Sequence, residues 1–262
     1  MLNLQNISYS IGRKKILQDI NASFRPGAFN MILGPNGSGK SSLLKIISGE
    51  INDFTGNVLY DEQNSRNIKK DLWAKSRAVL SQQPDLGFPL MVDEVVMMGR
   101  YPHFAFNPGK KDEAICSEVM KRLQLESFAS RNYLTLSGGE KQRVQFARVL
   151  AQIWEPVAGR NRYLFLDEPI ASLDIYYQHQ FLEIASQLVK DNITVVAVLH
   201  DINLSIQYGT HLFFMKDGQL VAEGSPATMI TPGLISSVFN IPVRVLQDEV
   251  SGKPFIAHSE HG

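Results

Sequence analysis

A glycine-rich octet near the N-terminus is the first segment whose residue types and spacing could do chemistry. Residues 34–41 read Gly-Pro-Asn-Gly-Ser-Gly-Lys-Ser, which matches the phosphate-loop pattern G-x-x-x-x-G-K-S/T. Glycines let backbone N–H groups curl round phosphate oxygens, while Lys40 is expected to reach the β- and γ-phosphates and Ser41 to hold Mg2+. A plain glycine turn is the alternative, which the apolar run before the octet disfavours. The residues predicted to bind phosphate are Gly34, Pro35, Asn36, Gly37, Ser38, Gly39, Lys40, Ser41 and Ser42.

Two neighbouring carboxylates follow an apolar run in the second half of the chain. Residues 162–167 read Arg-Tyr-Leu-Phe-Leu-Asp, and Glu168 and Pro169 come next. An open α/β sheet binds its ligand at the carboxyl ends of its buried strands. Asp167 therefore suits the Mg2+ shell, and Glu168 is placed to accept a proton from an attacking water. Taken alone, the pair could also be a solvated acidic turn.

A third segment, residues 136–143, reads Leu-Ser-Gly-Gly-Glu-Lys-Gln-Arg. Serine and glycine at the start of a predicted helix offer hydroxyl and N–H donors, so the segment predicts a second anion site. The alternative is that Ser137 only caps a helix with a charged face. A phosphate loop is common among nucleotide-hydrolysing proteins, whereas this octet is rare, which makes it the more specific signal.

The elements that must position these segments follow from hydrophobic periodicity. Alternation and turn residues predict an antiparallel sheet at the N-terminus and an Asp-Gly hairpin near the C-terminus. Continuous apolar runs predict buried parallel strands joined by right-handed helical crossovers, so the pattern is that of an α/β protein. The expected strands are 2–9, 16–24, 29–33, 162–167 and 194–200 with a hairpin over 213–224, and the expected helices are 41–48, 111–129, 138–154 and 176–190.

Composition narrows the classes of protein. A length of 262 residues fits one α/β domain with a small subdomain. Lys and Arg together number 26, as do Asp and Glu, so the basic surplus of a nucleic-acid binder is missing and no nucleic-acid partner is expected. The single cysteine, Cys116, excludes an intramolecular disulfide. The N-terminus lacks the pattern of a secretory signal, and no apolar run approaches the roughly 18 to 20 residues that cross a bilayer, so membrane contact is expected only through a partner.

Taken in chain order, with residues 136–143 between the phosphate loop and the acidic pair, the three segments resemble the motifs of ABC ATPases, and the resemblance covers nearly the whole chain. It implies a P-loop NTPase fold with a mixed parallel core sheet, an N-terminal antiparallel β subdomain and a helical subdomain that carries the signature segment 136–143. The core is expected over residues 1–85 and 160–262, and the helical subdomain over 86–159. The resemblance further implies Mg2+-dependent ATP hydrolysis by a homodimer, in which the phosphate loop of one chain faces the signature segment of the other.

The resemblance also implies roles for single residues. Tyr9 stands where the family has its adenine-stacking aromatic residue. Gln82 matches the glutamine that touches Mg2+ and senses the transport subunit, with Gln83 as the alternative. His200 resembles the histidine that contacts the γ-phosphate. The predicted catalytic residues are then Lys40, Gln82, Glu168 and His200, and the predicted metal ligands are Ser41, Gln82 and Asp167. The residues expected to contact nucleotide across the dimer are Ser137, Gly138, Gly139, Glu140 and Asp174.

Two positions depart from the family pattern. Ile170 stands where Thr or Ser is usual after the Glu-Pro pair, and Ala171 stands where a second small polar residue is common before Ser172. Neither position removes a catalytic group. The expected consequence is at most a tuned contact between subunits.

Several stretches resemble a narrower group, the importers of iron chelates and vitamin B12, and most closely the ATP-binding subunits of bacterial hemin importers. These stretches are 88–103, 147–154, 218–226, 243–246 and 251–254. The resemblance implies two transmembrane permease subunits, an indirect link to a periplasmic binding protein, and a place at the cytoplasmic face of the bacterial inner membrane. Ferric siderophore and cobalamin are alternative cargoes, and a non-transport ABC ATPase is the alternative of another class. Residues 86–103 are expected to help form the groove for a permease helix, with His103 as a surface histidine.

Overall fold

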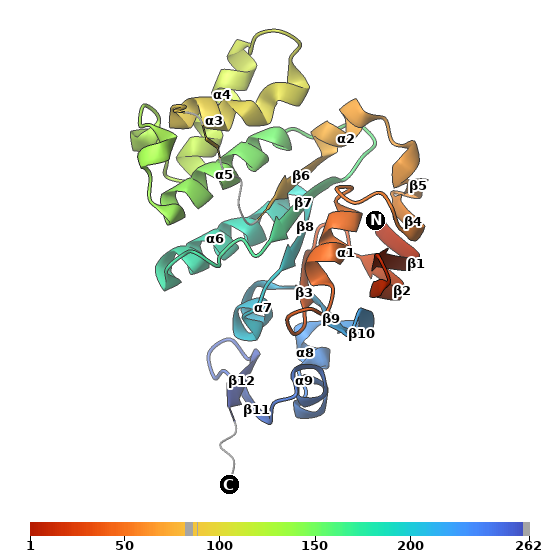
Figure 1. Ribbon diagram of the computed structural model, residues 1–262. Coiled ribbons are helices and arrows are strands. Elements are labelled where there is room, and N and C mark those ends of the chain that lie inside the picture. The colour runs from red at the N-terminus through yellow and green to blue at the C-terminus, as the bar shows by residue number, and fades with distance from the viewer. Residues whose placement is uncertain (82–85, 88, 259–262) are drawn as a thin grey trace. The chain divides into compact units, whose positions relative to one another are not determined.

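The computed structural model describes residues 1–81, 86–87 and 89–258, which form two compact units. The first unit contains residues 1–67 and 185–262, and the second contains residues 68–184. The chain order of the elements can be followed by colour in Figure 1. Because both units contain helices together with β-strands, the predicted α/β class is confirmed.

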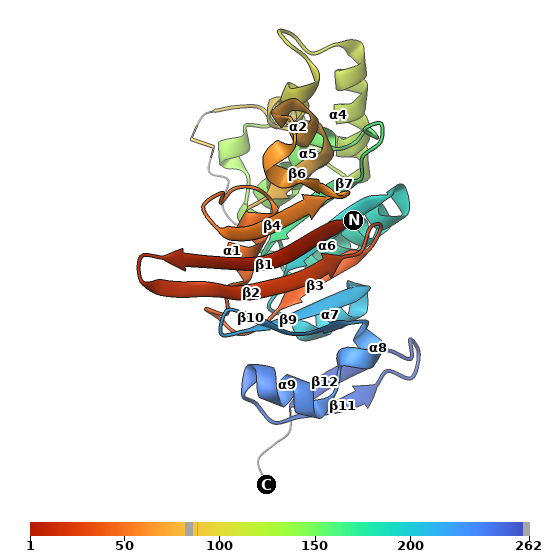
Figure 2. The same cartoon turned by 90° about the vertical axis from the view of Figure 1, so that its right-hand side faces the viewer.

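An antiparallel sheet opens the first unit, as predicted. Its strands are β1 (Leu2–Ile11), β2 (Lys14–Phe24), β4 (Thr55–Tyr60) and β5 (Gln63–Asn64), in the spatial order β2-β1-β4-β5. The long β1–β2 pair is seen in Figure 2 as two adjacent arrows that point in opposite directions. Its inward-facing residues, among them Leu4, Ile7 and Ile20, are buried, which explains the alternation in the sequence.

A second sheet of the first unit has the order β10-β9-β3-β8. Strand β3 (Phe29–Leu33) runs parallel to β8 (Ile193–Val198) and to β9 (His211–Lys216), and β10 (Gln219–Gly224) pairs antiparallel to β9. All residues of β3 and β8 are buried, as continuous apolar runs predict. The β9–β10 turn has positive φ at Asp217 and Gly218, as a type I′ hairpin requires. Helix α1 (Lys40–Ile47) follows β3.

The rest of the first unit lies at the end of the chain. Helix α7 (Ile202–Tyr208) follows β8, and a C-terminal hairpin pairs β11 (Val243–Gln247) with β12 (Pro254–His258). The Asn203 side chain joins α7 to this hairpin through two hydrogen bonds with the backbone of Ile256. The remaining elements are η1 (Ser65–Asn67), η5 (Val189–Asp191), α8 (Pro226–Met229) and α9 (Pro232–Phe239).

The second unit carries a parallel strand pair and a group of helices. Strand β6 (Arg77–Leu80) pairs with β7 (Arg162–Asp167), which is buried along its whole length. Helix α5 (Gly138–Gln152) packs against the other helices through a buried face that includes Val144, Phe146 and Leu150. The other helices are α2 (Lys70–Ser76), α3 (Val92–Met97), η2 (Met98–His103), α4 (Lys110–Arg122), η3 (Glu126–Phe128), η4 (Tyr133–Thr135) and α6 (Ile175–Leu188), of which residues 185–188 belong to the first unit.

One predicted helix is too long. The apolar spacing over residues 111–129 predicts a single helix, but α4 ends at Arg122. Gln124 has a φ of 54°, which breaks the right-handed helix, and the 3₁₀ turn η3 takes up the remaining residues. Leu123 and Leu125 are buried on either side of this break, so their apolar character reflects burial and not helical continuity.

Within the described residues, no helix combines the length and the apolar character needed to cross a bilayer.

Candidate nucleotide and signature sites

The predicted phosphate loop joins β3 to α1 in the first unit. A β-carbon on Gly34 would lie 2.1 Å from the carbonyl oxygen of Met215, and one on Gly39 would lie 2.7 Å from Leu17 Cδ2. Both glycines also have positive φ, 154° at Gly34 and 98° at Gly39. Only glycine fits these two positions, which explains their spacing in the motif. The loop therefore has a tightly specified backbone.

Two polar side chains of the loop, Ser38 and Lys40, are buried. Lys40 Nζ donates hydrogen bonds of 2.9 Å to the carbonyl oxygens of Gly34 and Pro35. Ser38 Oγ is buried and has no hydrogen-bond partner among the described residues. A buried hydroxyl without a partner is costly, and a phosphate oxygen would satisfy it. Together with the backbone N–H groups at the start of α1, this fits a bound nucleotide phosphate.

Tyr9 lies one strand away from the loop. It pairs with Leu17 across β1 and β2, and Leu17 is the residue whose side chain limits Gly39. The register shifts on both sides of Tyr9, so β1 bulges there and the side chain stays half-buried. This position is compatible with the predicted stacking on an adenine ring, which stays a prediction.

His200 follows the buried strand β8 and is exposed. Because β8 runs parallel to β3, His200 and Gly34 leave neighbouring strands at the same edge of the sheet. Leu199 N donates to Ile32 O at 3.4 Å, which ties the two strand ends together. The next residue, Asp201, caps α7 by accepting a hydrogen bond from Leu204 N. His200 therefore shares the edge of the sheet on which the phosphate loop begins.

The acidic pair ends β7 in the second unit. Asp167 is the last residue of the strand and is buried, whereas Glu168 is half-buried. Glu168 has a φ of 49°, a conformation that a residue with a β-carbon rarely adopts. The chain then turns through residues 169–173, and Asp174 caps α6 by accepting from Tyr177 N at 3.0 Å.

Two glutamines that the sequence reasoning did not select hold this turn. Gln142 Nε2 donates to Pro169 O at 3.0 Å. Gln178 Nε2 donates to Ile170 O at 3.3 Å and to Leu173 O at 3.0 Å. Ile170, one of the two departures from the family pattern, is buried, and Ala171 is exposed. The only advance signal was that Gln142 belongs to the signature segment.

The signature segment begins α5. Ser137 Oγ accepts a hydrogen bond of 3.3 Å from Glu140 N, and Glu140 Oε2 accepts one of 2.7 Å from Ser137 N. This reciprocal pair is a capping box, so the helix-capping alternative for Ser137 is correct as a local description. Hydrogen bonds from Ser137 lower the pKa of Glu140, which keeps the carboxylate charged. Gly138 follows Ser137, and a β-carbon added to it would project into open space.

Gln82 and its alternative Gln83 lie outside the described residues, as does Phe88 of the expected permease groove, so the structure does not test these predictions. Around them, Met91 is exposed, whereas Met97 and Met98 are half-buried. Across the described part of the chain, no three His, Cys, Asp or Glu residues gather into a possible metal site. A magnesium ion does not need such a cluster, because it usually keeps several waters and binds one or two carboxylates together with substrate phosphates.

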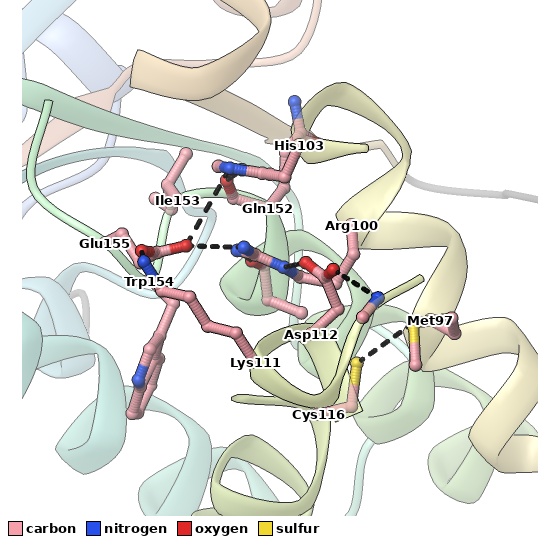
Figure 3. A network of polar contacts seen from close by, with 12 residues as sticks. Met97, Arg100, His103, Lys111, Asp112, Cys116, Gln152, Ile153, Trp154 and Glu155 are labelled. Atoms are coloured by element: carbon pink, nitrogen blue, oxygen red, sulfur yellow. Dashed lines mark hydrogen bonds and ion pairs between the residues drawn. The ribbon is translucent and has the colours of Figure 1, made fainter. Parts of the chain in front are cut away.

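A network of charges surrounds His103 (Figure 3). His103 Nε2 lies 2.8 Å from Gln152 O, and its Nδ1 lies 3.9 Å from Glu155. The side chain is only 11% exposed, so the prediction of a surface histidine is wrong. Burial lowers the pKa of His103, which favours the neutral ring. The physical reason is the packing of η2 on α5, which the local sequence does not reveal.

Each of the two units thus carries motifs of an ATPase. A strand that leads through a glycine loop into a helix defines the P-loop NTPases, and the capped glycine segment at the start of α5 narrows the class to ABC-type ATPases. The family model described as ABC transporter matches residues 17–171, which is more than half of the chain. The chain therefore belongs to the ABC transporter family, in which it is an ATP-binding and ATP-hydrolysing protein.

Curated relatives are similar over almost their whole length. Hemin import ATP-binding protein HmuV of Gloeobacter violaceus is 41% identical over 98% of this chain and 93% of its own. The protein of the same name from Mesorhizobium japonicum is 40% identical over 98% of this chain and 97% of its own. The predicted resemblance to hemin importer ATP-binding proteins is thereby confirmed.

Solved structures agree on the fold. A bacterial ABC transporter cassette solved as a dimer matches with a TM-score of 0.73 at 30% identity, covering 86% of this chain and 98% of that one. An inward-facing metal-chelate type ABC transporter matches with a TM-score of 0.80, covering 98% of this chain and 95% of that one. The latter is 23% identical and supports the fold alone. The predicted ABC ATPase fold is confirmed.

Proposed function

We propose that this chain is the ATP-hydrolysing motor subunit of an importer that takes up hemin across the bacterial inner membrane. The observation that carries the proposal is its similarity, at 41% identity over 98% of the chain, to a hemin import ATP-binding protein. The chain works as a homodimer bound to two permease subunits at the cytoplasmic face of that membrane. A periplasmic binding protein delivers hemin to the permease.

In the proposed reaction, each residue acts on a stated atom of ATP or of the attacking water. Lys40 binds the β- and γ-phosphates, and Ser38 donates its otherwise unpartnered hydroxyl to a phosphate oxygen. Glu168 accepts the proton of the attacking water, and His200 holds the γ-phosphate. Ser137 and Gly139 of the partner subunit neutralise charge that develops on the γ-phosphate. Tyr9 stacks on the adenine ring.

Mg2+ is the proposed cofactor, and Ser41 and Asp167 would hold it together with Gln82. When bound, it neutralises charge on the β- and γ-phosphate oxygens. Asp167 is buried at the end of β7 and offers a single carboxylate. One carboxylate suits Mg2+, because this cation keeps several of its waters when it binds a protein.

The proposed permease contact lies on the second unit. Met91, Tyr101, Phe106 and Leu134 are exposed there, although large apolar side chains usually avoid water. Where such side chains gather into one patch, they form a surface that binds another protein, and these four are the candidates for the permease contact. Movement of this surface on ATP binding would transmit force to the permease helices.

The base role of Glu168 is tested by the variant Glu168→Gln. The amide keeps the size of the side chain but cannot accept the proton, so hydrolysis should fall by about a hundredfold or more while ATP binding persists. Closed dimers should then accumulate with ATP in size-exclusion chromatography. Normal turnover by Glu168→Gln would show that another group is the base.

The cargo is tested by ATPase measurements on the chain reconstituted with its permease in lipid. The binding protein is added without ligand, or loaded with hemin, ferric siderophore or cobalamin. Stimulation by hemin alone supports the proposal. Stimulation by another cargo keeps the motor role but rejects hemin, and high activity that no permease alters favours a non-transport ATPase.

A further inference from the structure

Gln142 joins the signature helix to the residue after the proposed catalytic base. Its Nε2 donates a hydrogen bond of 3.0 Å to the carbonyl oxygen of Pro169, which lies 27 residues further along the chain. Gln142 is only 8% exposed. Because both groups are withdrawn from water, breaking this bond would leave a buried carbonyl or amide unsatisfied.

The backbone on the other side of this bond is strained. Glu168 has a φ of 49°, and such a conformation persists only where surrounding contacts determine it. Gln178 binds the carbonyl groups of Ile170 and Leu173 from α6, which directly follows the turn. Gln142 is therefore the side chain that anchors the turn from a distant segment, immediately beside Glu168.

A second contact joins the same two segments. A β-carbon on Gly139 would lie 3.3 Å from Cδ2 of Leu173, so the first turn of α5 packs closely on the end of the turn. The start of the signature helix thus meets the turn at Pro169 and again at Leu173. These two contacts hold the first turns of α5 against the turn that follows Glu168.

We infer that Gln142 is a positioning residue for ATP hydrolysis, whose carboxamide fastens the signature helix to the backbone that carries Glu168. The inference rests on the proposed function, because it takes Glu168 as the base. In the proposed dimer, Ser137 contacts the nucleotide held by the partner subunit, whereas Glu168 acts on the nucleotide of its own chain. The Gln142–Pro169 bond is therefore a direct link, inside one subunit, between the two nucleotide sites.

The expected signature is a change in turnover without a change in ATP binding. Gln142→Leu keeps the approximate volume of the side chain but removes the donor, so Glu168 is held less tightly in the orientation that accepts the proton. We expect kcat to fall about tenfold or more, equivalent to about 1.4 kcal/mol of barrier. The KM for ATP should change less than about twofold, because the phosphate loop and Tyr9 are untouched.

A second variant separates positioning from a loss of packing. In Gln142→Glu, the carboxylate cannot donate to Pro169 O, but the protonated acid can, and burial raises the pKa of such a carboxyl group. The kcat of Gln142→Glu relative to wild type should therefore rise as the pH falls from about 8 to about 6. The same ratio for Gln142→Leu should stay flat.

Gln145→Leu is the matched control. Gln145 lies on the same helix and is 1% exposed, but its Nε2 donates to Tyr133 Oη at 2.8 Å and not to the turn. Its kcat should stay within about twofold of wild type at a temperature below the melting point of every variant. Melting temperatures are measured for all variants, so that loss of folded protein is not counted as loss of turnover.

Two results would overturn the inference. One is a wild-type kcat in Gln142→Leu. The other is a parallel loss of kcat in Gln142→Leu and Gln145→Leu with a flat pH ratio for Gln142→Glu, since that pattern reports packing alone. The variant Glu168→Gln distinguishes the two levels of proposal. If it is inactive while Gln142→Leu is normal, only the inference fails, whereas normal turnover by Glu168→Gln rejects the base role itself.

Discussion

Arg100 and Asp112 form a buried ion pair in the second unit, with Arg100 Nε 2.9 Å from Asp112 Oδ1. The Arg100 side chain is 1% exposed, and its guanidinium also donates to Ala151 O at 2.8 Å and to Glu155. Burial by itself would raise the pKa of Asp112, but hydrogen bonds from Gly109 and Arg100 outweigh it and lower the pKa. The three contacts bind η2, α4 and the end of α5 to one another (Figure 3).

The first prediction concerns the stability that this pair provides. Arg100→Met removes the buried charge and leaves Asp112 without its cationic partner, so the free energy of unfolding should fall by about 3–5 kcal/mol. Urea denaturation of the isolated chain measures this free energy of unfolding. The control is Lys111→Met, because Lys111 also pairs with Glu155 but is 75% exposed and should contribute less than about 1 kcal/mol. Equal losses in the two variants would contradict the prediction.

The second prediction concerns His211, the first residue of β9. Its ring is buried, its Nδ1 has no hydrogen-bond partner among the described residues, and it packs edge-on against Phe213. Burial, and secondarily the charge of Arg25, lower the pKa of His211. The folded state therefore binds fewer protons than the unfolded state between the lowered pKa and the ordinary value of about 6.5.

The direction in which stability changes with pH follows from this difference in bound protons. Stability from His211 is fully present above about pH 6.5 and is lost as the pH falls towards and through the lowered pKa. His211→Phe should make the free energy of unfolding less dependent on pH in this range. Urea denaturation at several pH values tests it. His103 also has a lowered pKa and stays in both proteins, so the difference between the two curves isolates His211. Identical slopes would contradict the prediction.

The third prediction concerns the backbone of the phosphate loop. Gly34→Ala places a β-carbon 2.1 Å from Met215 O, so β9 or the loop must move. We expect a stability loss of about 1–3 kcal/mol and an ATP dissociation constant raised about tenfold or more. Thermal melting and titration with a fluorescent ATP analogue measure the two effects. Gly233→Ala is the control, because Gly233 has no heavy atom within 4 Å of the added carbon, and it should behave as wild type.

The fourth prediction concerns Tyr9. If its ring stacks on adenine, Tyr9→Ala should raise the KM for ATP about tenfold, since stacking on a base contributes about 1–3 kcal/mol. Tyr9→Phe keeps the ring and should leave KM near the wild-type value. The kcat should be similar in all three proteins, because the ring does not touch the reacting atoms. Steady-state ATPase kinetics measure these KM values. Equal KM values for Tyr9→Ala and Tyr9→Phe would reject stacking of the ring on adenine.

Much of the fold could be predicted because, in several strands and in one hairpin, the residue types match the burial and the backbone conformation that the fold requires. Strands β3 and β7 are buried along their whole length, so their residues form continuous apolar runs with the predicted bounds of 29–33 and 162–167. The hairpin at Asp217 and Gly218 was equally visible, since few residue pairs adopt two positive φ values. The phosphate loop and the acidic pair could be predicted for another reason, because phosphate and Mg2+ binding restrict their residue types.

Helix ends were less predictable. Periodicity records which face of a segment is buried, but not whether the backbone is continuous. Leu123 and Leu125 therefore extended the predicted helix past Arg122, although the positive φ of Gln124 ends it. The surface position predicted for His103 failed for a related reason, since a polar side chain can be buried when another helix supplies its hydrogen bond.

The amino-acid sequence was thus sufficient for the class of protein and for most strands, because each depends on residues that are close together in the chain. Contacts between distant segments were not visible in it: the approach of Met215 to Gly34, the pairing of Arg100 with Glu155, and the bond from Gln142 to Pro169. Each depends on where two backbones come to rest against each other. That position results from packing over the whole unit, so no short stretch of residues encodes it.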